Sequence, residues 1–193
     1  GMSRAHIVGA SMGGMIGQIV AALFPQRILS FTSIMSSSGD RRLPGARQDI
    51  VMDMARRAMG MEAVTMEGTI ALWRKIGSPG YQPSDEELAA RITRSMERSN
   101  YPEGYSRHLA AIIANGSRVE LLKKITAPTL VIHGKDDALV PVECGIDTAK
   151  HIRGSRLEVI VGMGHDLPGE LVPTFVQLIS EHALAAQQRV TAA

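Results

Sequence analysis

The chain has 193 residues, 45% of them hydrophobic and 21% charged, and 21 basic against 19 acidic residues give a net charge of +2. A chain of this length can bury one sizeable core, whereas the balanced charge and the 4% aromatic content argue against a nucleic-acid-binding surface. One cysteine excludes an internal disulfide, and no apolar stretch approaches the ~20 residues of a membrane span or resembles a signal peptide, so we expect a cytoplasmic protein.

The first motif is the sequence Gly9-Ala10-Ser11-Met12-Gly13, which lies between an apolar run at residues 5–8 and a helical pattern at 14–24. A nucleophile elbow has this order of strand, turn and helix, with a serine in a strained turn between residues small enough to avoid the neighbouring strand and helix. The helix N-terminus directs amide groups at an oxyanion, and the Met12 amide is the predicted first donor. The alternative is an ordinary strand-to-helix turn.

The next elements are a strand at residues 28–35 and then a block without strand patterns, from 41 to about 116. This block contains four helical stretches, and glycines at 60, 77 and 116 are predicted to end helices in the left-handed conformation. Ser84 and Glu87 have the spacing of a capping box. Six methionines could line an acyl pocket or simply pack the block against itself; they are Met52, Met54, Met59, Met61, Met66 and Met96. The predicted helices lie at 46–59, 61–76, 84–99 and 102–115.

Strand patterns return at residues 129–133 and 157–161, with helices predicted at 142–152 and 168–186 and a frayed end. The first of these strands ends before Asp136 and Asp137, and a glycine-rich loop after the second presents His165. Serine, acid and histidine therefore follow in the order of a hydrolase triad. The carboxyl ends of parallel strands meet at one crevice, so we expect these three side chains to converge there.

Three segments carry a family resemblance: residues 5–14, 131–141 and 162–168. They resemble the nucleophile, acid and histidine segments of the α/β-hydrolase superfamily, and are most similar to capped esterases of the aclacinomycin methylesterase type. The resemblance implies an α/β fold, the C-terminal part of an α/β-hydrolase with a mostly parallel sheet flanked by helices. Residues 1–40 and 117–193 would form the core and 41–116 an all-helical cap insertion over the active site.

By position, the resemblance makes Ser11 the nucleophile, Asp137 the acid and His165 the base of a serine esterase that uses no cofactor. In the family the acid stands three residues after the glycine that ends the strand, here Gly134, which favours Asp137 over Asp136. Asp40, after the second strand, is a further alternative acid, although a turn or capping role suits it better. The substrate would be a small ester or related acyl compound; perhydrolysis and carbon–carbon bond hydrolysis use the same motifs.

The other histidines are weaker candidates for the base. His133 lies inside a strand and suits a core or turn role, and His6 lies on the elbow strand. Three more fall on helical patterns and are expected to face solvent; they are His108, His151 and His182. Neither Cys144 nor the histidines have the spacing of metal ligands, so no metal site is expected.

In the family four strands precede the elbow strand, and the loop with the second oxyanion donor lies among them; ten residues precede Ser11 here. We therefore expect the elbow strand to be an open sheet edge, since Ile7 and Val8 lack the charges or prolines that protect natural edges. Such an edge predicts a homodimer or larger assembly. The second hypothesis for function is accordingly a catalytically weak or silent fragment that associates with itself.

Overall fold

The computed structural model describes residues 1–61, 63–99 and 101–191. Four parallel strands form one sheet in the order of the chain, and each predicted strand is present. They are β1 Ala5–Ala10, β2 Ile28–Ile34, β3 Thr129–Gly134 and β4 Arg156–Ile160. The two inner strands, β2 and β3, are buried almost throughout, and β1 and β4 at the edges are partly exposed. β3 has the continuous apolar run at residues 130–132 that is typical of a strand covered on both faces, whereas β2 also buries the polar residues Ser30, Thr32 and Ser33.

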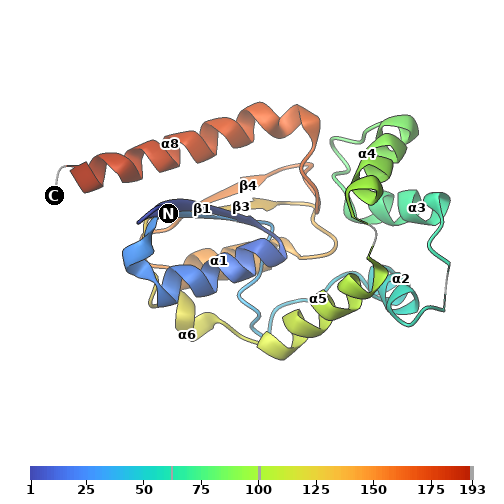
Figure 1. Cartoon of the computed structure of the whole chain (residues 1–193), viewed down its shortest axis with the longest axis horizontal. Helices are drawn as coiled ribbons and strands as arrows, with labels where there is room; N and C mark the ends of the chain where they lie inside the picture. The colour runs from blue at the N-terminus through green and yellow to red at the C-terminus, as the bar shows by residue number, and fades with distance from the viewer. Residues whose placement is uncertain (62, 100, 192–193) are drawn as a thin grey trace.

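Helices cover both faces of the sheet (Figure 1). One face carries α1 Met12–Leu23, the short α6 Val119–Leu122 and α7 Val142–His151, with the 3₁₀ turn η1 Pro25–Arg27 after α1. The other face carries α8 Val172–Thr191, which follows the 3₁₀ turn η2 Gly169–Leu171. The sequence pattern did not indicate α6, and α8 continues beyond the predicted end at residue 186.

Two apolar clusters hold these layers together. Phe31, Leu122 and Ile152 are buried on the α1 side of the sheet. Ile132 and Phe175 are buried on the α8 side. Burial of such side chains stabilises the fold by roughly 1.5–3 kcal/mol each, so the sheet is a rigid platform for the loops at its ends.

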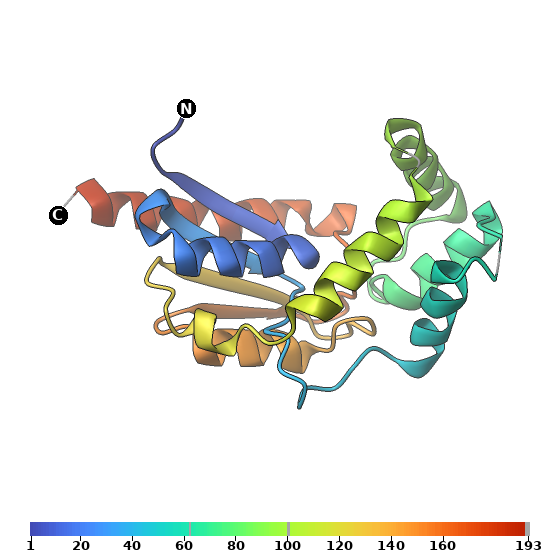
Figure 2. The ribbon, with the colours of Figure 1, turned by 60° about the horizontal axis from the view of Figure 1, so that its bottom comes forward.

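The segment between β2 and β3 is helical, as predicted. It contains α2 Gln48–Ala58, α3 Met66–Ile76, α4 Asp85–Arg98 and α5 Pro102–Asn115. These helices gather beyond the end of the sheet at which the strand arrows point (Figures 1 and 2). The carboxyl ends of the strands, where parallel sheets place their ligands, therefore face this helical group.

The helix ends within this segment follow the sequence signals in part. Ser84 Oγ accepts from Glu87 N at 3.2 Å and Glu87 Oε2 accepts from Ser84 N at 2.9 Å, so the predicted capping box is confirmed. Gly60 and Gly116 have the positive φ that favours glycine, +67° and +64°, but the ψ of −145° places Gly116 outside the left-handed helical conformation that was predicted. The prediction for Gly77 is wrong, because its φ is −71°. A side chain there would meet the Trp73 carbonyl oxygen at 2.7 Å, so close packing explains this glycine.

The methionines of the segment do not pack its interior as a group. Met52, Met59, Met61 and Met96 are 42–72% exposed. The interior instead uses Ile50, Leu88 and Ile92, each less than 9% exposed. Packing of the segment against itself is therefore the wrong explanation for most of these methionines.

The helical segment leaves and rejoins the core at one crossing point, where the buried side chain of Arg118 lies. Its Nε donates to Gln18 Oε1 at 2.9 Å, and its Nη2 donates to Ser37 O at 2.9 Å. Its Nη1 donates to Asn115 Oδ1 at 2.5 Å and to Gly116 O at 3.1 Å. Burial lowers the pKa of the guanidinium. One cation thus ties the outgoing and returning ends of the helical segment to α1.

Candidate active site

Ser11 occupies a strained turn between β1 and α1. Its φ of +51° and ψ of −118° are rare for a residue with a side chain. The turn is held because Ser11 N donates to the Ile34 carbonyl oxygen at 2.9 Å and the Ser11 carbonyl accepts from Gly14 N and Met15 N. Its Oγ makes no capping bond to α1 and is free to interact elsewhere. A hydroxyl in such a turn is presented at the end of the sheet.

Two glycines near Ser11 occupy positions where a side chain would collide, and only one of them, Gly9, was predicted. A side chain at Gly9 would lie 2.2 Å from the Gly13 carbonyl oxygen, and one at Gly14 would lie 2.7 Å from Ser36 Cβ. At Gly13 the space is open, so the expectation that a side chain there would collide is wrong. The turn requires Gly9 and Gly14 because α1 approaches β1 and the end of β2 there.

Asp137, His165 and Ser11 form a continuous chain of hydrogen bonds. His165 Nδ1 is 2.7 Å from Asp137 Oδ2, and His165 Nε2 is 2.9 Å from Ser11 Oγ. Because a carboxylate accepts, Nδ1 carries the proton and Nε2 is left to accept from the serine hydroxyl. His165 is 7% and Asp137 5% exposed. The three predicted residues, 154 positions apart at the extremes, are therefore brought together.

The Asp137 carboxylate is held by its own loop as well as by histidine. Its Oδ1 accepts from Leu139 N at 3.0 Å and Val140 N at 2.7 Å, leaving Oδ2 directed at His165. Asp136 points elsewhere, and its Oδ2 accepts from Gly162 N at 2.8 Å. Burial and backbone donors thus fix the orientation of the Asp137 carboxylate, whereas the Asp136 carboxylate connects its loop to the loop that contains Gly162.

Asp40, the remaining alternative acid, lies outside this chain of bonds. Its Oδ1 accepts from the backbone of Arg42 at 3.0 Å, and its carboxylate pairs with the Arg42 guanidinium. These hydrogen bonds hold the pKa of Asp40 well below its usual range. The expected turn role describes this residue.

His133 lies beneath the acid and is fully buried. Its Nε2 donates to the Val140 carbonyl oxygen at 2.8 Å and lies 3.7 Å from Asp137 Oδ2. Within the described chain its Nδ1 has no hydrogen-bond partner. Burial lowers the pKa of His133, which therefore supports the acid loop as a neutral side chain.

The other histidines make structural contacts. His6 Nδ1 lies 2.8 Å from Ser30 Oγ. His151 and His182 are half-buried and bind backbone carbonyls, so the expectation that they face solvent is wrong; His108 is exposed as predicted. His165 is therefore the histidine that contacts the Ser11 hydroxyl.

Met12 is the first residue of α1, so its amide is among the helix N–H groups without an intrahelical acceptor. It directly follows Ser11 in the chain, and its role as a donor to an oxyanion stays a prediction. In residues 1–61, 63–99 and 101–191, no three or more His, Cys, Asp or Glu side chains are grouped to hold a metal ion. Over the same ranges, no helix is both long and apolar enough to span a membrane.

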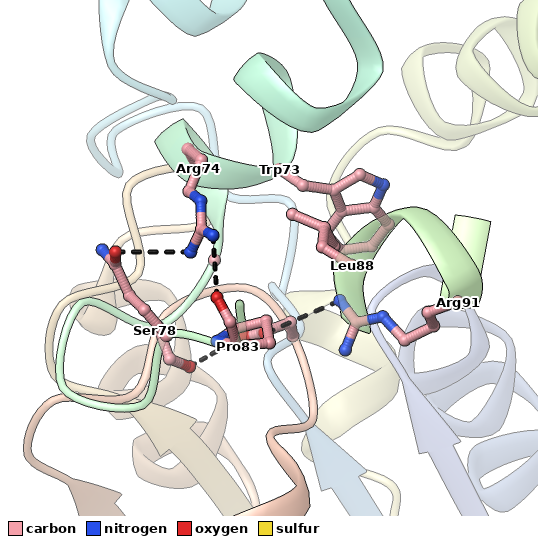
Figure 3. Close-up of a pocket in the computed structure, with 9 residues that line it drawn as sticks. Trp73, Arg74, Ser78, Pro83, Leu88 and Arg91 are labelled. Atoms are coloured by element: carbon pink, nitrogen blue, oxygen red, sulfur yellow. Dashed lines mark hydrogen bonds and ion pairs between the residues drawn. The ribbon is translucent and has the colours of Figure 1, made fainter. Parts of the chain in front are cut away.

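A small pocket lies between α3 and α4 (Figure 3) and is lined in part by Asp166, the residue after His165. Trp73, Ser78, Leu88 and Arg91 line it, together with the Asp166 carboxylate. Its volume of about 10 Å³ is close to the space of one water molecule, so it is too small for an organic substrate. Ser78 and Asp166 were not anticipated from the sequence, because they lie 88 positions apart and neither belongs to a local motif.

The sequence matches the alpha/beta hydrolase fold family over residues 1–170. The chain belongs to this family. Rhodomycin D methylesterase DnrP of Streptomyces peucetius is 24% identical, with 94% of this chain and 67% of that protein aligned. A 2-hydroxy-6-oxononadienedioate/2-hydroxy-6-oxononatrienedioate hydrolase of Pseudomonas sp. is 26% identical, with 93% of this chain and 62% of that protein aligned. This alpha/beta hydrolase chain thus spans about two thirds of the length of these relatives.

Solved structures share the fold of this alpha/beta hydrolase. The enol-lactonase of Burkholderia xenovorans superposes with a TM-score of 0.68 at 20% identity, covering 94% of this chain and 66% of that one. The 2-hydroxy-6-oxo-6-phenylhexa-2,4-dienoate hydrolase BphD of Rhodococcus sp. gives 0.71 at 21% identity, covering 94% and 64%. The predicted α/β fold is therefore confirmed.

Proposed function

We propose that this alpha/beta hydrolase cleaves a small carboxylic ester or related acyl compound through an acyl-enzyme on Ser11. The observation that carries the proposal is the unbroken path from Asp137 through His165 to the Ser11 hydroxyl, with contacts of 2.7 and 2.9 Å. Membership of a hydrolase family supports the same reaction class. Among the relatives, a methylesterase supports an ester as the substrate.

In the proposed reaction, the Ser11 oxygen bonds to the substrate carbonyl carbon while His165 Nε2 takes the hydroxyl proton. Asp137 keeps the other proton on Nδ1 and stabilises the imidazolium. The Met12 amide donates to the oxyanion. His165 then returns its proton to the leaving alkoxide, and the C–O bond to the alcohol breaks. Water attacks the acyl-enzyme with His165 as base, which releases the acid and restores Ser11.

We further propose that residues 41–116 act as a cap over this site. Support comes from their position beyond the carboxyl ends of the strands (Figure 1) and from hydrogen bonds between residues 76–81 and the histidine loop. A cap excludes water and shapes the acyl pocket. This role would explain why the helices are inserted between β2 and β3 rather than added at a terminus.

Pre-steady-state kinetics tests the triad. With p-nitrophenyl acetate we expect a burst of nitrophenol followed by slower turnover, as deacylation limits the rate. Ser11→Ala should abolish the burst and retain the fold, because alanine also fits the turn. The matched control is Ser180→Ala on the exposed surface of α8, which should retain the burst. A burst that survives in a folded Ser11→Ala protein would remove the serine from the mechanism.

One observation favours the second function, a weak enzyme that associates with itself. In the described chain β1 pairs with β2 alone, and Val8 on β1 is 49% exposed. An open edge with apolar side chains invites pairing with another strand. We therefore propose a dimer through β1 and expect Val8→Lys to shift it toward monomer in light scattering. A monomer before the substitution, with robust ester turnover, would contradict this second proposal.

A further inference from the structure

The histidine loop is fastened along its length to the turn that follows α3. His165 N donates to the Ile76 carbonyl oxygen at 2.7 Å, and Gly80 N donates to the Gly162 carbonyl oxygen at 2.9 Å. A side chain at Gly164 would lie 2.2 Å from the Gly77 carbonyl oxygen, so the two backbones are in direct contact. The position of His165 thus depends on the helical segment as well as on the sheet.

Ser78 bridges the residues on either side of His165. Its Oγ accepts from Gly164 N at 2.9 Å and lies 2.5 Å from Asp166 Oδ1. A hydroxyl has one proton, and a carboxylate accepts, so Ser78 donates to Asp166. The serine is 2% exposed, which keeps water from replacing either bond. One buried hydroxyl therefore fixes Gly164 and Asp166 together.

Asp166 is 6% exposed and needs partners for its charge. Ser78 binds one carboxylate oxygen, and Arg91 Nη2 lies 3.9 Å from the other. The Arg91 guanidinium is in turn placed over the Trp73 ring, 5.1 Å from its centroid. Figure 3 shows Ser78 and Arg91 on opposite sides of the pocket, with Trp73 beside Leu88. The carboxylate consequently joins the histidine loop to the turn after α3 and to α4.

We propose that Ser78 and Asp166 are positioning residues that hold the His165 imidazole between Ser11 and Asp137. The inference rests on the proposed role of His165 as base. Neither residue takes a proton in the reaction. Their effect is geometric, since a misplacement of about 1 Å at a reacting group can cost about 10²-fold in rate. A purely structural role would lower the free energy of unfolding and leave the turnover of the folded protein unchanged.

The test compares Ser78→Ala with Ser84→Ala. Both variants remove a serine hydroxyl of the helical segment that accepts from a backbone N–H. Ser78 accepts from Gly164 N in the histidine loop, whereas Ser84 accepts from Glu87 N within α4. We expect Ser78→Ala to lower kcat by about 10–100-fold with KM changed by less than about threefold. Ser84→Ala should retain kcat. Asp166→Asn, which still accepts from Ser78 but loses its charge, should give a smaller loss in kcat.

The proton NMR signal of His165 Nδ1–H gives a readout independent of turnover. The hydrogen bond to Asp137 shifts this proton downfield, and we expect the signal to broaden in Ser78→Ala and persist in Ser84→Ala. A folded Ser78→Ala protein with unchanged kcat and an unchanged signal would overturn the inference. Should Ser78→Ala not fold, an unchanged signal and kcat in Asp166→Asn would overturn it. An inactive wild-type protein whose signal still responds to Ser78→Ala would contradict the proposed function and leave the positioning role standing.

Discussion

Replacement of Asp137 by asparagine tests how the base is oriented. In Asp137→Asn the new side-chain oxygen can keep the bonds from Leu139 N and Val140 N, which Asp137 Oδ1 accepts at 3.0 and 2.7 Å. The new amide NH₂ then faces His165 Nδ1, at the position where Asp137 Oδ2 accepts at 2.7 Å. A donor at this position forces the imidazole proton to Nε2, which can then no longer accept from the Ser11 hydroxyl.

The expected loss is large because the wrong tautomer removes the general base. In a serine protease the same change lowers kcat by about 10⁴-fold, or ~5.4 kcal/mol of transition-state stabilisation. We expect a loss of this order in ester turnover for Asp137→Asn. Asp136→Asn is the matched control; Asp136 binds Gly162 N at 2.8 Å and should matter by less than about tenfold. Equal losses in the two variants, or a greater loss at residue 136, would refute the assignment of the acid.

Two further predictions concern stability. Burial lowers the pKa of His133 below the ordinary 6.5. As the pH falls below 6.5, the unfolded chain therefore binds a proton at this histidine before the folded chain does. The free energy of unfolding should decrease as a result. Urea unfolding at about pH 7.5 and about pH 5.5 measures this decrease in the free energy of unfolding, which should be smaller in His133→Gln than in the unsubstituted protein. An equal decrease in the two proteins would show that His133 is not its cause. Arg118→Met leaves the buried Gln18 Oε1 without its donor and removes one of the two donors to Ser37 O, the other being Gln18 Nε2, and should cost about 1–3 kcal/mol in urea unfolding. Exposed Lys124→Met should change it by less than about 0.5 kcal/mol.

The sequence was sufficient for the fold and for the order of the site residues. The inner strand β3 is recognisable because burial on both faces favours a continuous apolar run. Ser11, Asp137 and His165 each follow a strand and lie in a loop of small or turn-forming residues, so their convergence follows from a parallel sheet. Each site residue can therefore be recognised from the few residues on either side of it in the sequence.

Contacts between distant segments could not be predicted in this way. The bond between Ser78 and Asp166 joins residues 88 positions apart, and its serine looks like any turn serine. Gly77 has the sequence context of a helix-ending glycine, yet the reason for it is steric, the nearby Trp73 carbonyl. Gly13 is the last residue of the motif and Gly14 follows it, and only the approach of Ser36 shows that Gly14 is the position that needs a glycine. Each of these depends on a packing partner that the residue's neighbours in sequence do not reveal.

Covalent labelling of Ser11 tests the central claim most directly. The folded protein is treated with a fluorophosphonate, which reacts with serines activated by a neighbouring base, and the adduct is located by peptide mass spectrometry. We expect one adduct, on Ser11, with no labelling of Ser11→Ala and much slower labelling of Asp137→Asn. A folded protein that stays unlabelled, or that carries the adduct on another serine, would contradict the account.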